Sequence, residues 1–171
     1  MNNFDLHTPT RILFGKGAIE KLREQIPAEA RVLITYGGGS VKKTGVLDQV
    51  LTALNGLDVL EFGGIEPNPS YETLMNAVKL AREEKVTFLL AVGGGSVLDG
   101  TKFIAAAAHY DANIDPWEIL EPYGSKIASA IPMGSVLTLP ATGSESNKGA
   151  VISRKTTGDK RAFMSSHVQP Q

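Results

Sequence analysis

The sequence predicts an α/β fold, a doubly wound parallel sheet with flanking helices and a small C-terminal β-hairpin. Three short β-type runs are each followed by a loop rich in glycine or proline and then by apolar residues at helical spacing. Such β-loop-α units in series form a parallel sheet, because each helix carries the chain back to the edge where the next strand begins. Right-handed crossovers then place the helices in a fixed hand. At 171 residues the chain can bury a core without disulfides or a structural metal.

The three units give six elements, each strand followed by its helix. They are 31–36 and 41–54, 58–62 and 70–84, and 87–92 and 96–108. The first helix follows from apolar residues that recur from Val41 to Leu54, and the second from a buried stripe between Leu74 and Ala81. The alanine run 105–108 in the third helix permits close packing on a sheet.

Further elements are predicted outside these units. They are an outer strand at 11–14 with a short helix through Ala18 and Leu22, a loop with a short helix at 111–126, a strand at 135–139, and a hairpin of 150–153 with 162–164. Pro140 ends the strand, because proline cannot continue a sheet ladder. The turn residues 157–159, Thr-Gly-Asp, connect the two halves of the hairpin.

Composition narrows the possible partners. The formal net charge of −1 and a pI near 6.3 give no broad attraction to nucleic acid or to anionic membranes, so any anion site must be local. No apolar stretch approaches the ~20 residues of a membrane span, and the polar start at 1–5 lacks the regions of a signal peptide. We therefore expect a cytoplasmic protein with no nucleic-acid or membrane partner. Because the chain has no cysteine, disulfides, thiolate catalysis and zinc-cysteine sites are excluded.

A glycine loop follows the strand at 87–92 and opens the third helix. Its residues 93–96 are Gly-Gly-Gly-Ser, and without Cβ atoms the backbone can approach a ligand while the N–H groups of the first helical turn point at it. The favoured ligand is a phosphate or pyrophosphate. Residues 37–41 repeat 93–97 as Gly-Gly-Gly-Ser-Val, so two loops at one sheet edge are placed to hold the two ends of a dinucleotide, as in Rossmann-like domains. The alternatives are tight βα turns and coincidence in a glycine-rich chain.

The motif from Gly93 to Lys102, Gly-Gly-Gly-Ser-x-x-Asp-x-x-Lys, is followed by Thr-Leu-Pro-Ala-Thr-Gly-Ser-Glu at 138–145. Together these segments resemble the N-terminal half of the iron-containing (group III) alcohol dehydrogenases. The chain looks most like the branch of NADPH-dependent broad-range aldehyde reductases and butanol dehydrogenases, and the resemblance covers nearly its whole length. It implies that residues 1–171 form one dinucleotide-binding domain of a two-domain dehydrogenase. The all-helical domain, whose Asp and three His bind a catalytic iron or zinc in this family, would be missing.

The resemblance also implies roles for individual residues. The loop at 93–96 would bind the pyrophosphate, and Asp99 would lie near the nicotinamide and its ribose. Thr138 and Thr142 would contact the adenosine half and the phosphates. Asn147 and Lys160 would approach the nicotinamide. Without the resemblance, these residue types also suit a first helical turn, strand or turn positions and an exposed hairpin. The predicted cofactor-binding residues are Gly37, Gly38, Gly39, Ser40, Gly93, Gly94, Gly95, Ser96, Asp99, Thr138, Thr142, Asn147 and Lys160.

The coenzyme preference is predicted from residues 37–43. In NAD-preferring relatives an acidic side chain near this strand end accepts hydrogen bonds from the adenosine ribose, and it would repel a 2′-phosphate. Glycine occupies that position here, while Ser40 and the loop N–H groups offer donors and Lys42 and Lys43 add positive charge. We therefore expect NADP(H) rather than NAD(H), although two lysines on a helix also fit a solvated face.

The three histidines do not suggest a metal site. His7, His109 and His167 are far apart and lack the spacing typical of ligands on one helix. The predicted function is an NADP(H)-binding domain of a metal-dependent alcohol dehydrogenase or aldehyde reductase, which in its full length transfers hydride between NADPH and short aldehydes. For this chain alone, we expect cofactor binding without turnover.

Two alternatives remain. A non-catalytic truncated or engineered domain would serve folding or self-association, for example as a homodimer, through apolar surface left where the helical domain would pack. A glycerol dehydrogenase or a dehydroquinate-synthase-like enzyme would use a similar cofactor half, but the sequence Thr-Gly-Ser-Glu at 142–145 argues against such a relative.

Overall fold

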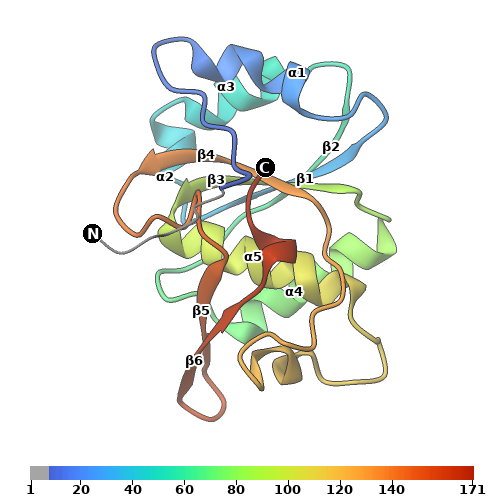
Figure 1. Ribbon diagram of the computed structural model, residues 1–171. Coiled ribbons are helices and arrows are strands. Elements are labelled where there is room, and N and C mark those ends of the chain that lie inside the picture. The colour runs from blue at the N-terminus through green and yellow to red at the C-terminus, as the bar shows by residue number, and fades with distance from the viewer. Residues whose placement is uncertain (1–7) are drawn as a thin grey trace, which may run out of the picture.

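The computed structural model describes residues 8–171 and confirms the predicted α/β fold (Figure 1). The strands are β1 (Arg31–Tyr36), β2 (Asp58–Phe62), β3 (Phe88–Gly94), β4 (Met133–Leu139), β5 (Gly149–Arg154) and β6 (Asp159–Met164). The α-helices are α1 (Leu22–Gln25), α2 (Ser40–Lys43), α3 (Val46–Ala53), α4 (Tyr71–Glu83) and α5 (Gly95–His109). Short 3-10 helices are η1 (Ala18–Lys21), η2 (Pro116–Leu120) and η3 (Ser166–Val168). Four parallel strands form a sheet in the order β2-β1-β3-β4, and β5 and β6 form an antiparallel hairpin.

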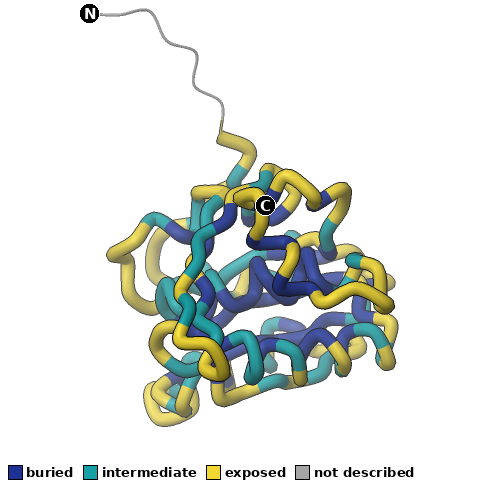
Figure 2. The backbone as a smooth tube through the Cα atoms, turned by 90° about the horizontal axis from the view of Figure 1, so that it is seen from below, coloured by how far each residue is buried: buried dark blue, intermediate teal, exposed yellow. Residues whose placement is uncertain are grey.

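Helices cover both faces of the sheet, which explains why β1 and β3 are apolar almost throughout. Leu33 and Leu89 pack with α4 and α5, whereas Val32, Ile34 and Leu90 pack with α3 on the other face. Side chains alternate across a strand, so one apolar run supplies two cores. In Figure 1, α1 and α3 lie on one side of the sheet and α4 and α5 on the other. Figure 2 shows the buried backbone in the interior and the exposed loops at the rim.

The hairpin lies against α5 and does not join the sheet. Phe163 of β6 meets Phe103 of α5 edge-on, with ring centroids 6.5 Å apart. Ser153 N–H of β5 donates to the carbonyl of Pro69 at 3.0 Å, next to Ser70, which caps the start of α4. Val151 N–H of β5 also donates to Asp99 of α5 at 3.0 Å. These contacts place the hairpin beside the start of α4 and the first three turns of α5, near the edge of the sheet where its parallel strands end.

Two elements differ from the sequence prediction. Residues 11–14 do not form a strand. Gln171 donates its N–H to the Met133 carbonyl at the start of β4, and the backbone N–H of Arg11 donates to the Gln171 carbonyl, so Gln171 lies between this segment and β4. The apolar pattern at 41–54 is divided into α2 and α3. Gly45 between them has a φ of 72°, a left-handed conformation that interrupts a right-handed helix.

Candidate functional site

Three loops meet at the carboxyl edge of the sheet. Strands β1, β3 and β4 are parallel neighbours, so the segments that follow them, 37–40, 94–96 and 140–147, leave the sheet at the same edge. The chain after β2 joins them, because Gly64 N–H donates to the carbonyl of Gly37 at 3.1 Å. The fold thus brings both glycine loops together with the threonine-bearing loop after β4.

The start of α5 is open toward this edge. A Cβ on Gly95 would lie 2.5 Å from Oγ1 of Thr142, and a Cβ on Gly93 would lie 2.7 Å from Cγ2 of Val97. Only glycine fits these two positions without displacing a neighbour. No side chain caps the start of this 15-residue helix in the described structure, so its first N–H groups are free for a ligand. Such a helix start favours a phosphate group.

The loop after β1 is more exposed. A Cβ on Gly38 or Gly39 would meet no atom within 4 Å, and Ser40 is exposed. Lys42 lies above Tyr36, with its Nζ 5.0 Å from the ring centre, and the nearby Tyr36 hydroxyl raises the pKa of the Lys42 ammonium. Because α2 has only four residues, the donors here are the loop backbone and lysine rather than a helix terminus.

Asp99 connects α5 to two other segments. Its Oδ1 accepts from Ser144 Oγ at 2.8 Å, and its Oδ2 accepts from Val151 N–H at 3.0 Å. Ser144 Oγ also lies 2.8 Å from Oγ1 of Thr142. Both carboxylate oxygens are therefore occupied within the protein. Ser144, which is buried, received no role from the sequence because its partner lies in another segment.

Lys102 is a buried cation one turn further along α5. Its side chain is fully buried, and its Nζ donates to the Asn147 carbonyl at 2.8 Å, to Asn147 Oδ1 at 2.9 Å and to the Gly149 carbonyl at 2.8 Å. Burial lowers the pKa of this ammonium to about 8, although the carboxylates of Asp99 and Glu145 oppose the shift. The motif contained Lys102, and its spacing from Asp99 places both on one helix face, but sequence reasoning gave it no role.

The remaining predicted residues are exposed. Asn147 Nδ2 donates to the Thr142 carbonyl at 3.4 Å, and Thr138 lies near the end of β4. Lys160 of β6 donates to Asn68 Oδ1 at 2.8 Å, which places it beside the loop between β2 and α4. The sequence analysis did not name Asn68 as a partner of Lys160. Its φ of 54° is one that asparagine tolerates in turns, and its position between two prolines indicates a turn in the sequence.

A carboxylate fixes the loop that carries Asn68. Glu66 Oε1 accepts from Ser70 Oγ at 2.7 Å, Thr73 Oγ1 at 3.0 Å and Lys155 Nζ at 2.7 Å. Burial opposes ionisation of Glu66, but hydrogen bonds from Lys155, Ser70, its own backbone and Thr73 outweigh burial and lower its pKa to about 2. The loop after β2 and the turn of the hairpin are thereby joined.

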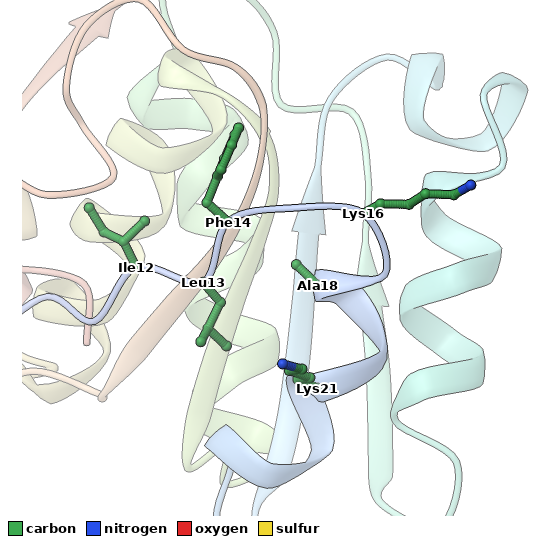
Figure 3. A pocket seen from close by; sticks show the side chains of 6 residues that line it. All are labelled: Ile12, Leu13, Phe14, Lys16, Ala18 and Lys21. Atoms are coloured by element: carbon green, nitrogen blue, oxygen red, sulfur yellow. The ribbon is translucent and has the colours of Figure 1, made fainter.

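Two pockets are lined by other residues of the chain. One runs along the N-terminal segment and η1 and is lined by Ile12, Leu13, Phe14, Lys16, Ala18 and Lys21 (Figure 3). The other is lined by Tyr123, Gly124, Ser125, Ile127, Lys148, Met164, Ser165, Ser166 and His167. None of the predicted cofactor-binding residues lines either pocket.

Residues 8–171 contain no group of three or more His, Cys, Asp or Glu side chains that could hold a metal ion. His109 and His167 are both exposed, and His7 lies outside the described residues. Within the same residues, no helix has both the length and the apolar character needed to cross a bilayer.

The parallel sheet with flanking helices and two glycine loops at one edge is that of a Rossmann-like α/β protein, and comparison with known proteins identifies the family. A sequence model of the iron-containing alcohol dehydrogenases matches residues 9–171. The chain therefore belongs to the iron-containing alcohol dehydrogenase family, as the resemblance of its motifs indicated.

Individual relatives agree with this assignment. The chain is 85% identical over 170 residues to the NADPH-dependent aldehyde reductase YqhD of Escherichia coli strain K12, which covers 99% of this chain and 44% of that protein. A crystal structure of E. coli K-12 YqhD matches with a TM-score of 0.96 at 85% identity over 99% of this chain and 43% of that one. The NADH-dependent butanol dehydrogenase A of Thermotoga maritima matches with a TM-score of 0.92 at 42% identity over 99% and 43%. The chain thus spans less than half the length of these relatives.

Proposed function

We propose that this chain is the NADP(H)-binding part of an aldehyde reductase or alcohol dehydrogenase that acts on short aldehydes. The observation that carries the proposal is the start of α5, which no side chain caps and where a Cβ on Gly94 would meet only the Leu139 side chain, at 3.8 Å. Backbone N–H donors that a ligand can approach closely fit a pyrophosphate. The name of the E. coli relative, an NADPH-dependent aldehyde reductase, supports the same coenzyme and substrate class.

The two ends of the coenzyme are assigned to different loops. In this proposal the residues 93–96 hold the pyrophosphate, Thr138 and Thr142 contact the adenosine half and the phosphates, and Asn147 and Lys160 orient the nicotinamide. When bound, NADPH supplies the hydride that reduces the aldehyde carbonyl. Asp99 acts by holding Ser144 and the Val151 backbone in place, with its carboxylate close to the nicotinamide ribose.

NADP(H) is proposed over NAD(H) on the chemistry of the loop after β1. Residues 37–40 carry no acidic side chain, and a Cβ on Gly38 would meet open space, so a 2′-phosphate has room there. Glu61 on the neighbouring strand accepts from the Tyr36 hydroxyl at 3.1 Å, and Lys42 stands beside the same tyrosine. The Thermotoga relative is named as NADH-dependent, so the named coenzyme differs among the relatives of this chain.

We propose binding without turnover for these 171 residues alone. More than half of the length of the E. coli relative lies outside the match, and the described residues bring no metal-ligand cluster together. No metal-assisted step is therefore assigned to side chains of this chain.

Self-association is the second candidate function, and a specific observation favours it. The apolar side chains of Ile12, Phe14 and Leu139 are 69%, 99% and 65% exposed. Where such side chains form a contiguous patch, another protein surface typically covers them. Analytical ultracentrifugation with and without NADPH distinguishes the two functions. Coenzyme binding predicts a monomer that binds NADPH, and self-association predicts a dimer that does not.

A glycine substitution tests the proposed function. Gly95→Ala would place a Cβ 2.5 Å from Thr142 Oγ1, so we expect NADPH affinity, followed by coenzyme fluorescence, to fall by at least about tenfold. Thr142 is exposed, so its side chain can move to make room for the Cβ, and the variant stays folded. The control is Gly134→Ala, whose Cβ would meet its nearest neighbour at 3.5 Å. Equal NADPH affinity in all three proteins would contradict the assignment.

A further inference from the structure

The buried ammonium of Lys102 is the starting point, because its three hydrogen bonds all reach one short segment. They go to the backbone and side chain of Asn147 and to the Gly149 carbonyl at the start of β5. An ammonium has three donors, so every donor of Lys102 is used. Through this buried ammonium, α5 therefore fixes the position of the loop after β4.

Asn147 connects these contacts to the carboxyl edge of the sheet, where the glycine loops lie. Lys102 and Gly149 N–H both donate to Oδ1 of Asn147, at 2.9 and 3.0 Å, which fixes the orientation of the amide. Its Nδ2 donates one N–H to the Thr142 carbonyl at 3.4 Å, and the second N–H of this amide remains for a ligand. Thr142 in turn lies against Gly95. A continuous series of contacts thus runs from the Lys102 ammonium to the start of α5.

An apolar residue at position 102 could not take over this role. The Asn147 and Gly149 carbonyls would lose the buried donor that they share. Leaving a partly buried acceptor without its partner costs more free energy than the hydrogen bond itself contributes. The charge is balanced nearby, since Asp99 and Glu145 both favour the charged form of Lys102. Asp99 holds Ser144 and Val151 of the same loop and strand, so two opposite charges on one helix face secure this loop at both ends.

We propose that Lys102 is a positioning residue of the coenzyme site, which holds Asn147 so that its Nδ2 is presented toward the bound nicotinamide nucleotide. The inference rests on the proposed function, because it concerns the same site. Lys102 itself is buried and does not touch the coenzyme. Its effect on NADPH passes through Asn147.

A double-mutant cycle tests this dependence in the 171-residue chain. The proteins are wild type, Lys102→Met, Asn147→Ala and the double variant, each titrated with NADPH. If Lys102 acts through Asn147, each single substitution weakens NADPH binding by about tenfold and the double variant is no weaker than Asn147→Ala alone. Independent effects that multiply would overturn the proposal. The matched control is Lys79→Met, an exposed lysine of α4, which should leave NADPH affinity within about twofold of wild type.

The side-chain amide of Asn147 gives a readout that needs no coenzyme. In nitrogen-15 NMR spectra of the free chain, Lys102→Met should shift or broaden the Asn147 side-chain signals while those of amides in β1 and β2 stay in place. If Lys102→Met does not fold, Lys102→Gln takes its place. Its amide is neutral, has two donors instead of three and is one bond shorter, so we expect the same changes in the Asn147 signals. Unchanged Asn147 signals in a folded variant would overturn the positioning role. Absence of NADPH binding by wild type would instead overturn the proposed function, whatever the NMR result.

Discussion

Lys102 and Asp99 lie one turn apart on α5 and hold the same loop through opposite charges. Lys102 donates to Asn147 and Gly149, and Asp99 accepts from Ser144 and Val151. A lysine in a helix ordinarily predicts a solvated side chain, and nothing local distinguishes one that is buried. The glycine loops could therefore be predicted from their spacing, whereas the residues that hold the third loop depend on tertiary contacts.

Burial of Lys102 predicts an unusual rise of stability in alkaline solution. Its pKa is about 8 in the folded chain, against an ordinary value of 10.5, so between these pH values the unfolded chain binds more protons. The free energy of unfolding should therefore increase as pH rises from about 8 to about 10.5, by up to about 3 kcal/mol. Urea denaturation at pH 8, 9 and 10 measures it.

The comparison protein for this prediction is Lys102→Gln, in which the titrating group is absent. Its curve of stability against pH should lack the increase that Lys102 gives to wild type, while all other groups titrate alike in both. Parallel curves for the two proteins would show that the Lys102 pKa is not lowered by folding.

At the scale of elements, hydrophobic periodicity predicted the sheet strands, α4, α5 and the hairpin. It could not show the break between α2 and α3, because the apolar pattern continues across Gly45 and only the backbone reveals the left-handed residue. It also predicted a strand at 11–14 from residue types alone. Strand formation requires a free neighbouring edge, and Gln171 already lies along the start of β4.

Glu66, which joins the β2–α4 loop to Lys155 of the hairpin, predicts that the free energy of unfolding falls in acid. The pKa of Glu66 is about 2 in the folded chain and 4.5 ordinarily, so its contribution is complete above about pH 4.5 and is lost as pH falls toward 2. Glu66 is 27% exposed, and after allowance for solvent screening the loss should be about 1 to 2 kcal/mol. Denaturation curves at pH 6 and pH 3 for wild type and Glu66→Gln give the value.

The matched control is Glu29→Gln, because Glu29 is exposed. Wild type and Glu29→Gln should lose stability in parallel between pH 6 and pH 3, and Glu66→Gln should lose less. An equal loss in all three proteins would exclude Glu66 as the acid-sensitive group of this junction.

At the scale of the whole molecule, the net charge of −1 gives no general attraction for a dinucleotide, so affinity must come from local donors. Parallel strand ends gather those donors at one edge. The sequence could predict this edge, since β-loop-α units in series imply parallel strands. It could not predict that Lys160 lies beside Asn68, because that pairing depends on how the hairpin packs against α4 and α5.

Coenzyme preference should depend on Lys42. In Lys42→Ala, affinity for NADPH should fall by about fivefold while affinity for NADH stays within about twofold, because only NADPH carries the 2′-phosphate. The difference should shrink as salt is added, since the lysine is exposed. Fluorescence titrations at low and high salt measure both coenzymes. Lys79→Ala is the control, and an equal loss for NADPH and NADH in Lys42→Ala would place Lys42 away from the 2′-phosphate.

The central claim is that these 171 residues form a coenzyme site for NADP(H). Calorimetric titration of the unmodified chain with NADPH and with NADH, without added metal, tests it most directly. We predict micromolar NADPH binding to one site per chain and at least about tenfold weaker binding of NADH. Absence of heat with NADPH, or equal affinity for the two coenzymes, would contradict the account.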